Sequence, residues 1–267
     1  MTLNSSDLTK ILKELLNSDL PKKERHLLNY DDLSAVAKSP MSYWINLNRK
    51  EVITPAKERE LKLSEATKLA LSNPFKFFEN VIIMPDFGDG RTKEAKEKKL
   101  EWLLANKNKE HLIQEEYDKI KNISIVFNSL PEKFKINNYV EESRIDLEDS
   151  FKLEVPSHFK NNTSLMNVSL WSDFSVRATD LEESIDKFGV YYKTAIQLLK
   201  HGKENINDCY LLIINKSNES QSIVVKLNKD KLSKVVENLS VECNNLIKVI
   251  ETEDNSPSEP QVVDLNK

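Results

Sequence analysis

Apolar positions in the first half of the sequence recur every three or four residues, which is the spacing of amphipathic helices. FGDGRT (87–92) is typical of a turn, and the apolar run NVIIMP (80–85) before it is typical of a short strand. Pro40 is expected to open a new short helix inside the second predicted helix. The first half is therefore predicted to be largely helical, with helices over residues 5–16, 31–47, 58–71, 92–105 and 113–130.

The pattern changes near residue 139, where β-branched and aromatic residues gather in short runs. This half predicts strands and helices in mixed order, and the polar residues 251–267, with two prolines, predict a disordered tail. Together the elements predict a mixed α/β fold, in which helices flank a central sheet of about five strands. We expect one domain over 1–250, with a helical N-terminal part over 1–80 and a sheet core over 139–228. The predicted elements are strands at 139–147, 150–159 and 164–171, a helix at 180–200, strands at 209–216 and 222–228, and a helix at 229–250.

Composition narrows the classes of function. The chain has only 4 glycines and contains neither G-x-G-x-x-G nor G-x-x-x-x-G-K, which argues against dinucleotide binding and P-loop chemistry. Its net charge of −4 argues against a broad DNA-coating surface but allows a local basic groove. Cys209 and Cys243 fall in different predicted elements, as expected for free thiols of an intracellular protein, and the 4 histidines show no paired zinc-ligand spacing.

Membrane association is not expected from the sequence. No apolar run approaches the roughly 20 residues needed to span a bilayer. We therefore expect a protein of the cytoplasm.

The predicted strand at 164–171 carries a small polar pair inside an apolar run. Asn167 and Ser169 are two residues apart, so their side chains are expected on the same face of the strand. A half-exposed strand face would by itself account for such a pair. A second explanation depends on a family resemblance.

Four segments, in their order and spacing, resemble the PD-(D/E)XK nuclease superfamily, and within it the phage-type exodeoxyribonuclease VIII (RecE) and YqaJ-like branch. The resemblance implies a restriction-endonuclease-like core, in which carboxylates on adjacent strands hold Mg²⁺ for hydrolysis of a phosphodiester. It also implies a phage or mobile-element protein acting in a bacterial host cell. The segments are LSAVAKSPMSYWINL (33–47), LKLSEATKLALSNPFKF (61–77), GRTKEAKEKKLEWL (90–103) and KFGVYYKTAIQLL (187–199).

Carried over residue by residue, the family pattern falls on six positions of this sequence. In chain order, the helix histidine, the glutamate, the two metal carboxylates, the strand lysine and the later glutamine fall on Lys68, Glu141, Ser157, Asn167, Ser169 and Lys193. Only Glu141 keeps the chemistry of the family. Because amides and hydroxyls are poorer Mg²⁺ ligands than carboxylates, the resemblance predicts a degenerate nuclease site with no catalytic residue intact and no cofactor.

Three functions stay open at this point. The first is a catalytically degenerate protein that binds double-stranded DNA ends, or a recombination or nuclease protein, and could form homo-oligomers. The second is an active Mg²⁺-dependent exonuclease of double-stranded DNA with displaced ligands, for which Glu141, Asp149 and Glu154 are the candidates. The third is an interaction protein without a nucleic-acid role, which the acidic net charge favours.

Overall fold

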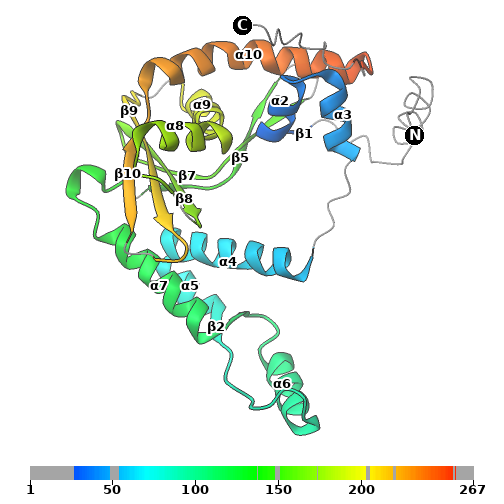
Figure 1. Cartoon of the computed structure of the whole chain (residues 1–267), viewed down its shortest axis with the longest axis vertical. Helices are drawn as coiled ribbons and strands as arrows, with labels where there is room; N and C mark the ends of the chain where they lie inside the picture. The colour runs from blue at the N-terminus through cyan, green and yellow to red at the C-terminus, as the bar shows by residue number, and fades with distance from the viewer. Residues whose placement is uncertain are drawn as a thin grey trace, which may run out of the picture.

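The computed structural model describes residues 27–48, 54–136, 138–147, 151–172, 174–202, 205–218, 221–254 and 256. A five-stranded mixed sheet forms the centre of the molecule, and helices pack on both of its faces (Figure 1). The predicted mixed α/β class, with a central sheet of about five strands, is confirmed. The helix predicted over 5–16 and residues 257–267 of the predicted tail lie outside the described residues.

The order of the central strands places one parallel pair in the middle of the sheet. β8 and β9 run parallel, with Leu165 opposite Cys209, and the other neighbours are antiparallel. The parallel pair needs a crossover connection, which α8 (Ala178–Lys187) and α9 (Val190–Lys200) provide. In spatial order the strands are β10 (Ser222–Lys226), β9 (Asp208–Asn215), β8 (Ser164–Trp171), β7 (His158–Lys160) and β4 (Asn138–Val140).

Two of the predicted strands are each broken into two shorter strands. Residues 139–147 divide into β4 and β5 (Ser143–Asp146), and residues 150–159 divide into β6 (Lys152–Val155) and β7. Pro156, between β6 and β7, has no N–H to donate to a ladder, so the strand changes partner there. β5 and β6 pair with β1 (Leu27–Leu28) in a separate three-stranded sheet of order β1-β6-β5.

The helices of the first half begin and end close to their predicted bounds. Pro40 opens α3, as predicted, and the Thr54 side chain caps α4 by accepting a hydrogen bond from the Lys57 N–H (3.2 Å). Sequence analysis missed α5 and the short β3, which pairs in parallel with β2. The bounds are α2 (Tyr30–Val36), α3 (Pro40–Asn48), α4 (Pro55–Ser72), α5 (Pro74–Asn80), β2 (Val81–Ile83), α6 (Lys93–Ala105), β3 (Glu110–Leu112), α7 (Gln114–Asn128), the 3₁₀ turn Glu132–Phe134 and α10 (Lys229–Glu251).

The single helix predicted over 180–200 is broken at Gly189. This residue has φ +63°, a left-handed conformation that favours glycine, and it separates α8 from α9. The ring of Tyr30 on α2 packs against it so closely that an added Cβ would lie 2.0 Å from the ring Cζ. The break therefore serves the docking of α2 onto the α8–α9 turn.

Three hydrophobic cores hold the elements together. The largest lies between the sheet and α2, α3, α9 and α10, and a second lies on the opposite face of the sheet under α7. The third joins α4, α5, α7, β2 and β3 around the buried Phe77, Leu112 and Ile120. Burial of each such large apolar side chain contributes about 1.5–3 kcal/mol. In the part of the chain that the structure describes, no helix combines the length and apolarity needed to cross a membrane.

Candidate functional site

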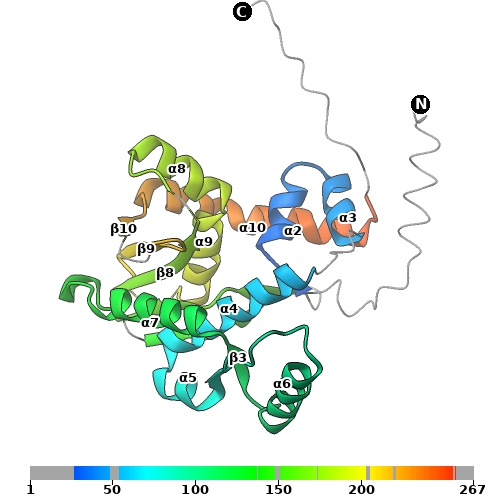
Figure 2. The same ribbon diagram turned by 60° about the horizontal axis from the view of Figure 1, so that its bottom comes forward.

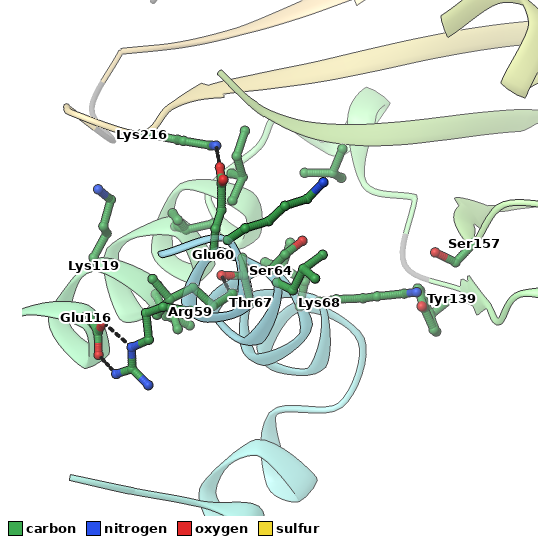
Figure 3. A pocket seen from close by; sticks show the side chains of 18 of the residues that line it. Arg59, Glu60, Ser64, Thr67, Lys68, Glu116, Lys119, Tyr139, Ser157 and Lys216 are labelled. Carbon is green, nitrogen blue, oxygen red and sulfur yellow. Dashed lines mark hydrogen bonds and ion pairs between the residues drawn. The ribbon is translucent and has the colours of Figure 1, made fainter. Parts of the chain in front are cut away.

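An open cleft of about 680 Å³ lies between α4, α7 and one face of the central sheet (Figure 3). Its floor is apolar and includes Val168 and Leu170 of β8 and Phe159 of β7. Five cationic side chains but only two carboxylates line it, so the cleft is positively charged although the whole chain is acidic. The cationic residues are Lys57, Arg59, Lys68, Lys119 and Lys216, and the acidic ones are Glu60 and Glu116.

Ion pairs connect α4 to the walls of the cleft. Lys216 Nζ lies 2.7 Å from Glu60 Oε1, and Arg59 binds the Glu116 carboxylate with two nitrogens and donates to the His111 carbonyl (2.9 Å). Lys119 has no ion-pair partner among the described residues, and Figure 3 shows its ammonium away from the Arg59–Glu116 pair. The cleft therefore has at least one cation available for an anionic ligand.

Lys68 and Ser157 are the two predicted site positions that line this cleft. Lys68 Nζ lies 2.6 Å from Glu142 Oε1, so the lysine pairs with Glu142 and not with its neighbour Glu141. Burial lowers the pKa of Lys68, but its hydrogen bonds and charge interactions with Glu142 and Tyr139 raise the pKa above its ordinary value. Figure 3 shows Lys68 extending from α4 towards Tyr139 on the Ser157 side of the cleft. Lys68 is therefore a charged residue of the cleft wall.

Asn167 points away from the cleft, to the opposite face of the sheet. Val168 and Leu170 of β8 face the cleft. Because side chains alternate along a strand, Asn167 faces the other side of the sheet, towards α9. Its Nδ2 donates to Gln197 Oε1 (2.9 Å) and Thr194 Oγ1 (3.0 Å), while Gln197 Nε2 donates back to Asn167 Oδ1 (2.9 Å). Gln197 and Thr194 are fully buried. Ser169, two residues further along the regular strand, lies on the same face as Asn167.

The glutamine that faces Asn167 is Gln197, and Lys193 lies elsewhere on α9. Lys193 Nζ sits over the ring of Tyr30, 4.9 Å from its centroid, and donates to the Phe188 carbonyl (3.2 Å). Burial lowers the pKa of Lys193, and the charge of Asp31 partly offsets this. The structure thus separates three groups of predicted positions: Lys68 and Ser157 in the cleft, Asn167 and Ser169 under α9, and Lys193 against α2.

Of the three candidate displaced ligands, the two that the structure describes come from different elements. Glu141 is exposed in the connection between β4 and β5, Glu154 lies on β6 of the smaller sheet, and Asp149 is outside the described residues. Glu154 acts electrostatically on Asp32 of α2, which sequence analysis missed. Burial, with smaller contributions from Asp31 and Glu154, raises the pKa of Asp32 to about 6 against the opposing hydrogen bond from the Asn29 N–H.

Carboxylates, histidines and cysteines do not gather into a larger cluster in the described part of the chain. No group of three or more of them is placed to hold a metal ion there.

A histidine pair extends the polar network under α9. His158 Nδ1 lies 2.9 Å from the Pro156 carbonyl, which only accepts, so this nitrogen carries the proton. His158 Nε2 lies 2.9 Å from His201 Nε2, so in the neutral pair His201 is the donor. Thr194 and Gln197 of α9 and its C-cap residue His201 recur every three or four residues, and this polar stripe was the sequence signal that could have revealed the network.

Comparison with known proteins supports the fold and no finer identity. No protein-family model and no curated protein matches the sequence. The crystal structure of a Eubacterium rectale protein named "Putative exonuclease" matches with a TM-score of 0.53 and 9% identity, over 95% of this chain and 88% of that one. A second structure, of SSO0001, has a TM-score of 0.29 and 14% identity over 94% and 86% of the two chains, and carries no argument. The chain therefore shares its mixed α/β fold with the Eubacterium rectale protein.

Proposed function

We propose that this chain is a RecE-like protein of a phage or mobile element that has kept the nuclease fold, has lost the metal site and binds the ends of double-stranded DNA. The observation that carries the proposal is the reciprocal amide pair of Asn167 and Gln197. The family resemblance puts a metal carboxylate at Asn167. A neutral amide, hydrogen-bonded on both its oxygen and its nitrogen, stands there instead.

The amide pair disfavours a metal ion for two reasons. Mg²⁺ binds oxygen ligands and prefers carboxylates, and Asn167 Oδ1 already accepts from Gln197 Nε2. Binding an ion there would take Asn167 Oδ1 away from the fully buried Gln197 amide, which would keep only the longer hydrogen bond to the Pro156 carbonyl (3.2 Å) for its Nε2, and a lost hydrogen bond costs about 0.5–1.5 kcal/mol. The other position that the resemblance assigns to a metal carboxylate is Ser157, whose hydroxyl is neutral, and the position assigned to the strand lysine is Ser169.

The cleft supports binding of a nucleic-acid end. Its volume is that of a pocket for one small ligand, so it has room for a terminal nucleotide and not for a duplex. Lys119 and the other cations of its rim would meet the phosphates, while the apolar floor would meet a base or sugar. Binding should therefore weaken as salt concentration rises.

The experiment that tests the proposal follows end-labelled linear duplex DNA in Mg²⁺ or Mn²⁺, beside an active RecE-type nuclease. We expect no digestion, and a gel shift at low salt that Lys119→Glu weakens and Lys99→Glu, on the exposed face of α6, does not. Digestion that EDTA abolishes, or tight stoichiometric binding of Mn²⁺, would contradict the loss of the metal site. Absence of both digestion and DNA binding would redirect the function to a protein partner, such as a recombination or nuclease protein.

A second candidate is an active Mg²⁺-dependent exonuclease with displaced ligands. The observation that favours it is that Glu154 on β6 lies near enough to Asp32 on α2 for its negative charge to add to the raised pKa of Asp32. If digestion is seen, alanine substitution of Glu141, Asp149 and Glu154 should abolish it. Activity that survives all three substitutions would exclude these residues as the ligands.

A further inference from the structure

α5 and α7 form a second groove, of about 440 Å³, on the outer side of the small core. Its walls include Phe77, Phe78 and Tyr117, and the ring of Phe77 stacks on that of Tyr117 with centroids 5.8 Å apart. Phe78 is 62% exposed and Ile125 is 56% exposed, and Phe75 on the same short helix is 84% exposed. Large apolar side chains gathered at a groove mark an interaction surface.

The chemistry of the groove defines what fits it. Lys121 is the one charged residue among those that line it, and it has no ion-pair partner within the described part of the chain. Asn128 Nδ2 already donates to the Ser124 carbonyl (2.8 Å), so this polar side chain of the groove has a hydrogen-bond acceptor within α7. The groove therefore suits a short segment with two or three apolar side chains and a carboxylate.

We propose that residues 257–267 of a second copy of this chain occupy the groove. This segment holds Val262, Val263 and Leu265, the apolar residues of an otherwise polar stretch after α10. Asp264 lies among them and Glu259 precedes them, so the segment supplies carboxylates to Lys121. The apolar side chains would pack against Phe78 and Ile125, as in other peptide-in-groove complexes.

The anchoring of the chain before this segment favours a second copy over the same copy. The Met41 N–H donates to the Ser256 carbonyl (3.0 Å), and Trp44 Nε1 donates to the Asp254 carbonyl (2.6 Å), so this part of the chain is held at α3. The 18 residues of α4, about 27 Å of helix, run between α3 and α5 (Figures 1 and 2). Val262 and Leu265 lie six and nine residues beyond the anchored Ser256, so they reach at most about 20–22 Å and 30–32 Å from it when the chain is fully extended, which leaves little slack for docking on the same copy.

A contact of a segment with a groove elsewhere on the surface joins unlike surfaces. Such heterologous contacts build head-to-tail assemblies, which close into rings or continue as filaments. The proposal therefore predicts self-association that depends on concentration and needs both the groove and the segment.

Self-association of the full chain gives the first test, by sedimentation velocity over a range of concentrations. We expect Phe78→Glu, and separately the triple change Val262→Ser, Val263→Ser and Leu265→Ser, to weaken association at least about tenfold. Leu104→Glu on α6 is the matched control, because Leu104 is 64% exposed and lies outside the groove. Circular dichroism should show the same helix content in every variant.

A peptide gives the second test. A fluorescent synthetic peptide of residues 251–267 should bind the triple tail variant of the full chain, and Phe78→Glu or Lys121→Glu in that chain should weaken binding at least about tenfold. Absence of peptide binding would overturn the proposal, whatever the oligomeric state. Association that Phe78→Glu removes but the triple tail change leaves intact would also overturn it, because the groove would then bind something other than the tail.

Discussion

Asn167 on β8 and Gln197 on α9 exchange two amide hydrogen bonds, each 2.9 Å long, across the face of the central sheet. The pair also reaches Thr194 Oγ1 and the Pro156 carbonyl, so one strand, one helix and the β6–β7 connection meet at it. A buried amide and a half-buried one that bond to each other hold two elements in register, because any shift leaves donors and acceptors unpaired. This position therefore contributes to stability.

Restoring a carboxylate at this position should destabilise the protein. In Asn167→Asp the side chain loses the two donors that Thr194 and Gln197 accept from, and brings a negative charge against Gln197 Oε1. We expect a loss of about 2–3 kcal/mol in the free energy of unfolding, measured by urea denaturation at pH 7. Asn128→Asp is the matched control, since Asn128 is exposed, and it should change stability by less than about 0.5 kcal/mol. Equal losses in the two variants would contradict the buried network.

Asp32 should make the protein less stable as pH rises through the weakly acidic range. Burial and the neighbouring carboxylates raise its pKa in the folded state to about 6, above its value in the unfolded chain. Its contribution to stability is therefore full below about pH 4 and is lost as pH rises through 6, by about 2–3 kcal/mol.

The measurement compares Asp32→Asn with the natural chain at pH 4 and pH 7 by urea denaturation. Because asparagine does not titrate, the free energy of unfolding of the variant should rise by about 2–3 kcal/mol relative to that of the natural chain from pH 4 to pH 7. The control is Asp230→Asn, in the first turn of α10, whose difference from the natural chain should not change by that amount. A constant difference for Asp32→Asn would show that the residue ionises normally.

Gly189 should tolerate no side chain. Gly189→Ala puts a Cβ at φ +63° and against the ring of Tyr30, so α2 must shift away from the α8–α9 turn. We expect the free energy of unfolding to fall by about 3 kcal/mol, because the alanine is strained in the left-handed backbone conformation and the Tyr30 ring is displaced. Gly90→Ala, where no heavy atom lies within 4 Å of the added Cβ, is the control and should cost less than about 0.5 kcal/mol. Tyr30→Ala should remove part of the cost when combined with Gly189→Ala.

The sequence predicted the elements whose signals are local. Pro40 and Thr54 mark helix starts by their own chemistry, and the apolar runs of β8 and β9 read as strands because both of their faces are buried. The division of residues 139–147 and 150–159 between two sheets was not predictable, because alternation does not say which strand will be the partner. The left-handed break at Gly189 likewise depends on Tyr30, which lies far away in the sequence.

Of the candidate site, the sequence predicted only which residues share one face of a strand. That Asn167 and Ser169 share a face follows from the two-residue period of a strand. This face meets Gln197, whereas Lys68 and Ser157 line a cleft whose floor includes Val168. Both facts depend on how α4 and α9 pack on opposite sides of the sheet, which the sequence pattern does not reveal. Asp32 was missed because its raised pKa comes mainly from burial, which depends on how α2 packs against elements distant in sequence.

The salt dependence of the proposed DNA binding should report how many cations of the cleft meet phosphates. Each phosphate contact contributes about 0.7–0.9 to the slope of log affinity against log salt concentration, because binding releases counterions. Lys119→Ala should therefore lower both the affinity and this slope by about one contact, measured by fluorescence anisotropy with a labelled duplex end. Lys99→Ala, on exposed α6, should leave both unchanged. A lower affinity with an unchanged slope would mean that Lys119 shapes the cleft without touching a phosphate, and DNA would then have to be held by other cations of the rim.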